Sequence, residues 1–253
     1  FVLAAMALDP GGVASCLRGA LFDAYQRHDH FADDPGAASP PTLVLEVDSG
    51  QWPWRSTMLA RLIGELKAAG AGLVVFTFPF DSTEASPQSL LDQIPPDHEF
   101  DPARTEIASL PAPGERLAEA LQGMKAVTGI ALGAAGADPL LKARFAYQGP
   151  KAPFAQVPSF AAARAPPEVI GNASAGIAAL NLFPDADGAL RRMPLLFRVG
   201  AKIVPSPDAE ALRILGQSAM LTVKGDENTL GTMLGLAPGI AALEAGREIA
   251  TAP

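Results

Sequence analysis

The residues of this chain that could do chemistry gather in two short segments. Residues 47–55 read Val-Asp-Ser-Gly-Gln-Trp-Pro-Trp-Arg and hold both tryptophans of the chain. Residues 184–194 read Pro-Asp-Ala-Asp-Gly-Ala-Leu-Arg-Arg-Met-Pro, so that two aspartates precede two arginines. Both segments follow strand-like runs, and ligands of α/β sheets bind beyond the carboxyl ends of strands. The candidate ligand-binding residues are therefore Asp48, Trp52, Trp54, Arg55, Asp185, Asp187, Arg191 and Arg192.

In the first segment, each side chain has a binding interpretation and a structural one. Asp48 and Arg55 could bind a polar ligand as an oppositely charged pair at the rim of a sheet. Alternatively, Asp48 accepts turn amide hydrogens, as strand-end aspartates commonly do, and Arg55 bridges to it. Trp52 and Trp54 fall on the same side of an extended segment. They could clamp a ligand or lie near a membrane surface, whereas such rings more often plug a core or an interface.

The second segment has the opening of a calcium-binding loop but not its end. Asp185 and Asp187 match the start of such a loop, whose twelfth position is a glutamate. That position is Leu196 here, so we favour a turn held by aspartate side chains over a metal site. Because Arg191 and Arg192 alternate along the following run, one should face the aspartates and the other should face solvent or a partner.

No catalytic or cofactor motif is complete in the sequence. The three histidines form no triad or zinc pattern, and His28 and His30 would diverge on a helix. The run Gly171-Asn-Ala-Ser-Ala-Gly176 is one residue too long for the nucleophile elbow of hydrolases. The single cysteine, Cys16, excludes an internal disulfide, and its apolar neighbours predict a small buried side chain. We expect no catalysis, no cofactor and no metal in this chain.

Composition narrows the class of protein further. The chain has 253 residues, of which 49% are hydrophobic, enough for a substantial core. The formal net charge of -8 argues against nucleic-acid binding, which needs clustered Lys and Arg. No run of 18 apolar residues occurs, yet the chain opens on Phe-Val-Leu-Ala-Ala-Met-Ala-Leu without an initiator methionine. This opening is either the trimmed end of a membrane helix or the start of a buried helix, and we expect the chain to be part of a longer protein.

Hydrophobic periodicity predicts an α/β domain. A strand at 42–48, a helix at 56–69 and a strand at 72–78 form a βαβ unit, whose strands should be parallel and buried. The Asp-Gly turn should join strands at 175–183 and 192–199 as a hairpin. The fold class is thus α/β, a mixed sheet with a parallel first half and a hairpin-containing second half, flanked by helices. Further helices are expected at 11–30, 114–123 and 206–215, further strands at 125–132, 200–205 and 219–224, and irregular loops at 81–113 and 133–168.

Two of these helices carry recognisable signals at their ends. Ser56 is placed to cap the helix at 56–69, and Gly70 to end it in the left-handed conformation. Ser206 is placed to cap the later helix, with Pro207 at its first position.

The order of these features resembles the CHASE2 domain, an extracytoplasmic sensor of bacterial receptors. The resemblance covers residues 10–225 and rests on Trp-Pro-Trp-Arg before one helix and Asp-x-Asp-Gly-x-x-Arg-Arg-x-Pro before another. The chain departs from the family at Thr77, where the family strand usually ends with an acidic residue. The resemblance implies an N-terminal helix at 1–30 that follows a membrane segment, a sensor core at 31–225, and a tail at 226–253 that leads to further membrane helices.

The resemblance also implies a function. Receptors of this family carry one membrane helix before the domain and typically three after it, followed by a cytoplasmic adenylate or guanylate cyclase, histidine kinase or Ser/Thr kinase. We therefore expect a membrane-tethered periplasmic domain of an inner-membrane protein, a homodimer that responds to an unknown small molecule or protein. Two alternatives are a soluble periplasmic α/β hydrolase that uses Asp48 or Ser174, and a dimerisation module without a ligand.

Overall fold

The computed structural model describes residues 12–28, 42–47, 55–80, 87–95, 98–111, 114–148, 154, 157–225 and 240–246. The chain divides into two compact units. The first unit comprises Phe1–Trp52 and Leu182–Met193, and the second unit comprises Pro53–Asn181 and Pro194–Pro253. All the described strands belong to the second unit.

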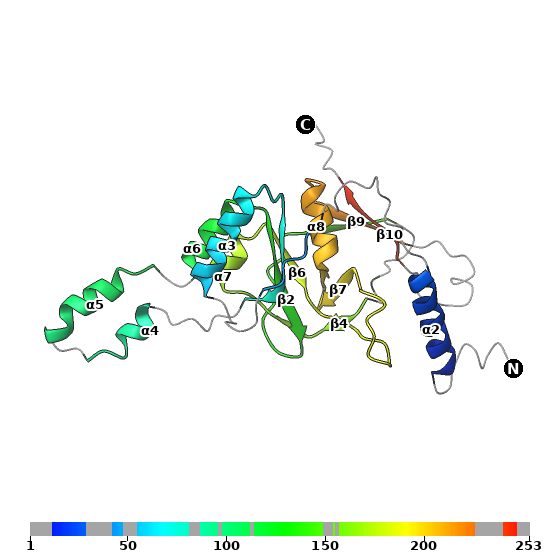
Figure 1. Cartoon of the computed structure of the whole chain (residues 1–253), viewed down its shortest axis with the longest axis horizontal. Helices are drawn as coiled ribbons and strands as arrows, with labels where there is room; N and C mark the ends of the chain where they lie inside the picture. Colours follow the sequence, from blue (N-terminus) through cyan, green and yellow to red (C-terminus); the bar gives the residue numbers. More distant parts are fainter. Residues whose placement is uncertain are drawn as a thin grey trace. The chain divides into compact units, whose positions relative to one another are not determined.

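A parallel sheet forms the centre of the second unit (Figure 1). Strands β1 (Val74–Pro79) and β6 (Gly176–Ala179) both pair in parallel with β2 (Ala126–Gly133), which lies between them. Strand β5 (Ala162–Arg164) pairs antiparallel with the last three residues of β2. The first five residues of β2 are buried, as expected of a strand that is covered on both faces.

Helices cover both faces of this sheet (Figure 1). Three helices pack against one another on one face, and a fourth lies on the other. The three are α3 (Ser56–Ala68), α6 (Glu115–Gln122) and α7 (Glu168–Ala173), and the fourth is α8 (Pro207–Leu215).

The hydrophobic core follows the alternation of side chains along β1. Phe76 packs in the core that α3 and α6 cover, whereas its neighbour Val75 packs in the cluster that holds Ile214 of α8. The helix residues of the first core recur at a spacing of four, which places them on one helix face. They are Leu59 and Ile63 in α3, and Leu117 and Leu121 in α6.

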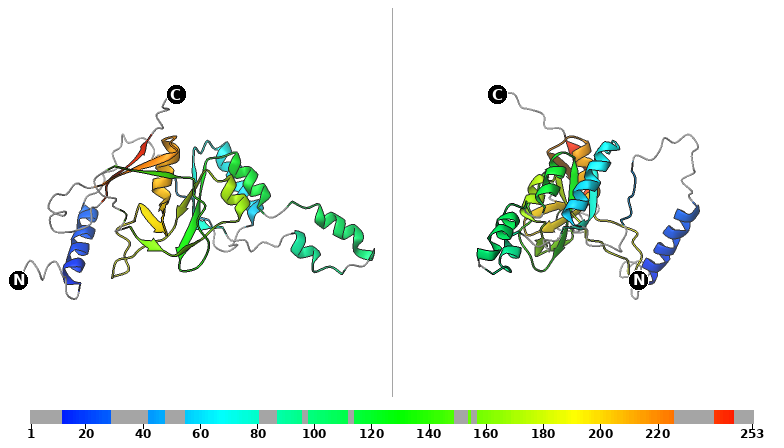
Figure 2. Two further views of the ribbon diagram at one scale, coloured as in Figure 1. Left: turned by 180° about the vertical axis from the view of Figure 1, so that it is seen from behind. Right: turned by 60° about the vertical axis from the view of Figure 1, so that its left-hand side comes forward.

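Two three-stranded sheets complete the second unit, which Figure 2 shows from behind. In one, β9 (Met220–Gly225) pairs in parallel with β3 (Arg144–Gln148) and antiparallel with β10 (Ile240–Gly246). In the other, β7 (Leu196–Val199) pairs in parallel with β4 (Ser159–Phe160) and antiparallel with β8 (Lys202–Pro205). Gly200, with a φ of 57°, makes the tight turn between β7 and β8.

The structure confirms most of the predicted elements. The helices expected at 56–69, 114–123 and 206–215 and the strands expected at 72–78, 125–132, 200–205 and 219–224 are present to within two residues. Gly70 follows α3 with a φ of 87°, as predicted for its end. The predicted Ser56 cap was wrong, because Ser56 is the first helical residue and Arg55 stands at the N-cap position. The Ser206 hydroxyl oxygen accepts a hydrogen bond from the backbone N–H of Ala209 at 3.2 Å, so Ser206 caps α8 as predicted. The mixed α/β fold class is confirmed.

The predicted βαβ unit was wrong in its first strand. Residues 42–47 form no strand, and Leu43 and Val44 are 84% and 88% exposed. The parallel partner of β1 is instead β2, which comes about 50 residues later in the chain. Strand propensity shows only that a segment suits a pleated sheet, and packing against other strands decides whether it joins one.

The predicted hairpin was placed one turn too early. Strand β6 pairs with β2, whereas β7 pairs with β8 across Gly200. The Asp-Gly turn does form, because Gly188 has a φ of 83° and its N–H donates to the carbonyl oxygen of Asp185 at 2.8 Å. A tight turn makes a hairpin only where the flanking runs pair with each other, and β6 already has a parallel partner.

The two predicted loops contain regular elements. Residues 81–113 include α4 (Pro87–Leu91), η2 (His98–Phe100) and α5 (Asp101–Ala108), and residues 133–168 include β3, β4 and β5. Proline misled the prediction, since Pro87 and Pro102 stand in first helical turns, where a missing N–H costs nothing. The guanidinium of Arg104 on α5 donates to the carbonyl oxygens of Leu91 and Ile94 at 3.2 and 2.8 Å and so closes the end of α4.

A buried ion pair anchors α8 in the second unit. Glu210 is fully buried, and both of its carboxylate oxygens accept hydrogen bonds from Arg213, at 2.8 and 2.7 Å. The same guanidinium donates to the carbonyl oxygens of Ser218 and Ala175 at 2.9 and 3.0 Å. At Gly176 a side chain would meet the Cγ atom of Glu210 at 2.5 Å, so only glycine leaves room for the pair.

Replacing Arg213 by methionine should lower the free energy of unfolding by about 3–5 kcal/mol, because Glu210 would stay buried without a partner. Methionine at both Glu210 and Arg213 should recover much of this loss, since no charge is then buried. Urea unfolding measures both effects. Exposed Arg116 on α6 is the control, and its change to methionine should cost at most about 0.5 kcal/mol. A double variant as unstable as the single one would contradict the coupling of the pair.

Candidate functional site

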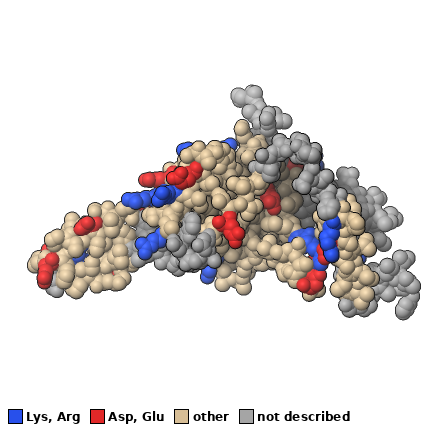
Figure 3. All heavy atoms as spheres, in the orientation of Figure 1, with Lys and Arg blue, Asp and Glu red and all other residues tan. Residues whose placement is uncertain are grey.

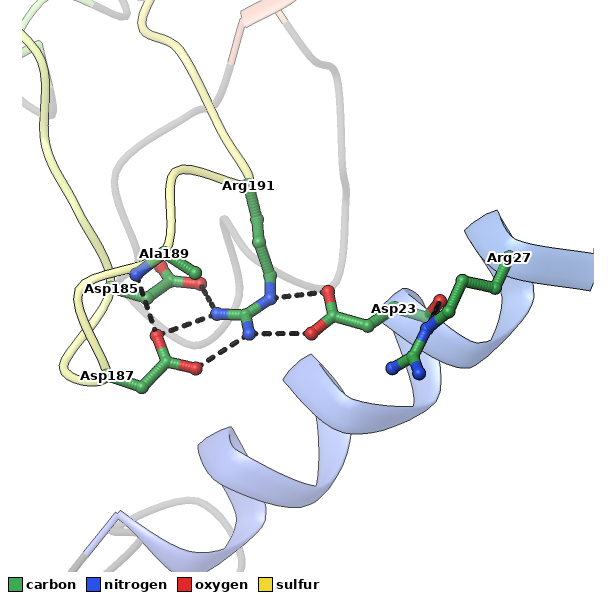
Figure 4. A network of polar contacts seen from close by, with 6 residues as sticks. All are labelled: Asp23, Arg27, Asp185, Asp187, Ala189 and Arg191. Atoms are coloured by element: carbon green, nitrogen blue, oxygen red, sulfur yellow. Dashed lines mark hydrogen bonds and ion pairs between the residues drawn. The ribbon is translucent and has the colours of Figure 1, made fainter.

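The turn at residues 185–189 presents two carboxylates to Arg191 (Figure 4). The N–H of Asp185 donates to the carbonyl oxygen of Ala189 at 2.9 Å, which closes the turn. The carboxylate of Asp187 accepts from the N–H of Ala189 at 3.1 Å, so the aspartate stabilises its own turn. These bonds hold both aspartates on the side where the chain returns with Arg191.

Arg191 uses all five of its N–H donors on three carboxylates (Figure 4). Nη1 donates to Asp185 at 3.0 Å and to Asp187 at 2.9 Å, and Nη2 donates to the second oxygen of Asp187 at 2.6 Å. Nε and Nη2 donate to the two oxygens of Asp23, each at 2.8 Å. A guanidinium has five donors in a planar fork, so this set, which we call the Arg191 network, is complete.

Asp23 belongs to helix α2 (Val13–His28), the main element of the described first unit. The helix predicted at 11–30 is thereby confirmed. One turn before Asp23 stands Gly19, where an added side chain would come within 3.3 Å of the guanidinium carbon of Arg191. Gly19 thus leaves a flat surface on the helix, and the carboxylate of Asp23 lies beside it. The planar guanidinium of Arg191 packs on this surface and binds the carboxylate.

The electrostatics of the network favour the charged forms of Arg191, Asp187 and Asp23. The side chain of Arg191 is 10% exposed, and hydrogen bonds to Asp23, Asp187 and Asp185 raise its pKa. Hydrogen bonds from Arg191 and from the N–H of Ala189 lower the pKa of Asp187 to about 2. The pKa of Asp23 is also lowered, first by the hydrogen bonds from Arg191.

The network holds two segments together and offers no centre for catalysis. Three carboxylates around one guanidinium leave excess negative charge, which the nearby cation of Arg27 on α2 partly offsets. Arg191 occupies the place between the aspartates where a cation would bind. Within the described ranges, no group of three or more His, Cys, Asp or Glu side chains is arranged to hold a metal ion.

The structure brings together three of the eight candidate residues, namely Asp185, Asp187 and Arg191. Arg192 is exposed, so the expectation that one arginine faces the aspartates and the other faces outward is confirmed. Arg55 is also exposed, and its carbonyl oxygen accepts from the N–H groups of Met58 and Leu59 in the first turn of α3. The other candidates, Asp48, Trp52 and Trp54, lie outside the described residues, and their roles stay predictions.

Sequence reasoning missed Asp23 and Gly19. Asp23 stands 168 residues before Arg191, and a single aspartate on a helix carries no signal of a distant partner. The interpretation of Cys16 was wrong, because this residue is exposed on α2. Apolar neighbours in sequence predict burial only if the apolar face of the helix turns inward.

The hydrolase alternative loses one of its two nucleophiles. Ser174 is buried, and its hydroxyl donates to the carbonyl oxygen of Ile170 at 2.7 Å at the end of α7. A hydroxyl in this position satisfies a helix terminus and does not face a substrate.

On the face shown in Figure 3, acidic and basic side chains of the described residues are interspersed, and neither sign forms a continuous patch. The family model of the CHASE2 domain matches residues 1–246, and the chain therefore belongs to the CHASE2 family, whose members are extracellular sensory domains of receptors.

The family match confirms the resemblance seen in the sequence. Comparisons with curated proteins and with solved structures gave no match. Among the residues that the structure describes, no helix has both the length and the apolar content needed to cross a bilayer.

Replacing Arg191 by lysine should loosen α2 from the 185–191 turn, because an ammonium group has three donors and no planar fork. We expect several-fold faster amide hydrogen exchange across residues 13–28. The matched control is Arg192→Lys, the same change at the exposed neighbour, which should leave the exchange unchanged. Equal exchange in the two variants would show that the network does not hold the helix.

The network should resist acid to an unusually low pH. Because the folded pKa of Asp187 is about 2, its stabilising effect is fully present above its unfolded pKa, about 4. That effect is lost as the pH falls through about 2. A carboxyl NMR titration of Asp187 measures this midpoint, which should rise in the Arg191→Gln variant. A midpoint at the ordinary carboxylate value in the unchanged protein would contradict the network.

Proposed function

We propose that this domain senses an extracytoplasmic signal and transmits it through α2 to a cytoplasmic cyclase or kinase. Its family membership supports the sensory role. The single observation that carries the transmission step is the pairing of Asp23 on α2 with Arg191, two hydrogen bonds of 2.8 Å between segments far apart in sequence. The signal is a small molecule or protein, and the domain works in the periplasm as part of an inner-membrane receptor.

The mechanism is a shift between two states of the Arg191 network. In one state, Asp23 shares the guanidinium with the two turn aspartates and holds α2 in place. In the other, the turn keeps Arg191 and releases Asp23, so that α2 can move. A signal that binds one state more tightly than the other shifts the equilibrium by the difference in its affinity. The excess of carboxylates makes the second state accessible, because Asp185 and Asp187 still neutralise Arg191 after Asp23 has left.

The test compares receptor variants that break the same contact from its two ends. In the receptor that carries this domain, Asp23→Asn and Arg191→Lys should change the basal output in the same direction and by similar factors. The double variant should add little to either single change, because residues of one network are not additive. Arg192→Lys is the control and should leave the output unchanged.

Nucleotide cyclisation or autophosphorylation in membranes, normalised to receptor abundance, gives the readout. If Asp23→Asn and Arg191→Lys both leave the output at its original level while hydrogen exchange shows α2 released, α2 does not transmit the signal.

A further inference from the structure

Helix α2 exposes a row of large apolar side chains. Val13, Leu17, Leu21 and Tyr25 are 62%, 66%, 76% and 63% exposed. They recur every fourth residue, and residues at this spacing lie one above the other on a helix. The row therefore forms a continuous apolar stripe along the helix, which we call the α2 stripe.

The α2 stripe lies on the side of the helix opposite the Arg191 network. Successive helix residues are rotated by about 100°, so Leu17 and Leu21 each lie about 160° from Gly19. Gly19 and Asp23 contact Arg191, and Figure 4 shows Asp23 pointing from α2 toward the 185–191 turn. A surface helix of a globular protein normally turns its apolar side to its own domain and its charged side to water. For α2 the order is reversed, since its charged side is bound and its apolar side is exposed.

We propose that the α2 stripe packs against the α2 stripe of a second copy of this chain, in a parallel two-helix seam. Leu17, Leu21, Ala24 and His28 follow one another at spacings of four, three and four, the spacing at which two helices pack along a common seam. The same face of both helices then meets across a twofold axis, as in most homodimers.

The charges beside the stripe are compatible with this arrangement. In a parallel pair, Arg18 lies next to Val13 of the second copy and Tyr25 next to Ala20 of the second copy, because flanking positions five residues apart meet across the seam. No like charges then face each other at these positions. Aliphatic parts of Arg18 can cover Val13 while the guanidinium stays in water.

The area is sufficient for a specific contact. The four stripe residues expose on the order of 500 Å² on one helix, so two copies would cover about 1,000 Å² in total, the lower bound for a specific interface. The seam rests on these exposures, whereas its parallel direction also rests on the proposed function, because two receptors in one membrane are related by an axis along the membrane normal. The seam would make α2 both the element that the Arg191 network holds and the contact between the subunits.

Disulfide trapping tests the seam. Cys16 is the single cysteine of the chain, so its change to serine gives a background free of thiols. In that background, Leu17→Cys and Leu21→Cys should each form disulfide-linked dimers under mild oxidation. Gln26→Cys, also exposed but on the Arg191 side of the helix, should form at least tenfold less. Leu21→Glu in the otherwise unchanged chain should shift sedimentation from dimer to monomer with the circular dichroism spectrum preserved.

Three outcomes would overturn the proposal. Equal trapping at Leu17, Leu21 and Gln26 would indicate random collision. Trapping only in mixtures of Leu17→Cys with Tyr25→Cys would show antiparallel helices. A monomer that binds phosphatidylglycerol vesicles and loses this binding with Leu21→Glu would assign the stripe to a membrane surface. Because trapping needs no signal and no output, a receptor whose output ignores Arg191→Lys but still cross-links at Leu21 would refute the proposed function and support the seam.

Discussion

The structure depends on one constraint: all five N–H donors of a nearly covered arginine must find hydrogen-bond acceptors. The side chain of Arg191 is 10% exposed, and an unpaired donor on a covered cation is costly. The 185–189 turn satisfies part of this requirement with Asp185 and Asp187. The remaining donors need a carboxylate that presents two oxygens in one plane, and α2 supplies it through Asp23. Within the described part of the first unit, hydrogen-bonded charges therefore tie α2 to the 185–191 turn.

The same constraint sets the orientation of α2. Once Gly19 and Asp23 face Arg191, Leu17 and Leu21 of the α2 stripe, about 160° from Gly19, point the other way. Helix α8 of the second unit differs, because its ion pair joins two residues of the same helix. Glu210 and Arg213 pair with each other inside the fold and tie the helix to the sheet. Both helices are anchored by a guanidinium that binds a carboxylate at two points, and in α2 this contact lies opposite the α2 stripe.

Local sequence patterns predicted where helices and strands form better than they predicted which strands pair with each other. Leu59 and Ile63 recur at helical spacing, so α3 could be placed from the sequence. Residues 42–47 show the limit of such patterns, because their strand propensity does not say which strand they would pair with. The Asp-Gly turn shows the same limit, since the predicted turn forms with its glycine in the left-handed conformation, although the runs on either side pair elsewhere. Hydrogen-bonding partners of strands are chosen by packing between segments far apart in sequence, and local sequence patterns do not reveal that choice.

For the candidate site, the sequence by itself determined the turn, its two aspartates and the arginine that returns to them, because these residues lie within seven positions of one another. Local chain geometry alone brings such neighbours together. Only the tertiary structure decided that Asp23 completes the set and that Arg192 does not take part. The physical reason is that one face of a helix acquires a partner only when the chain folds back over a separation of 168 residues. In the sequence alone, an aspartate one helical turn after a glycine looks like any other solvated carboxylate.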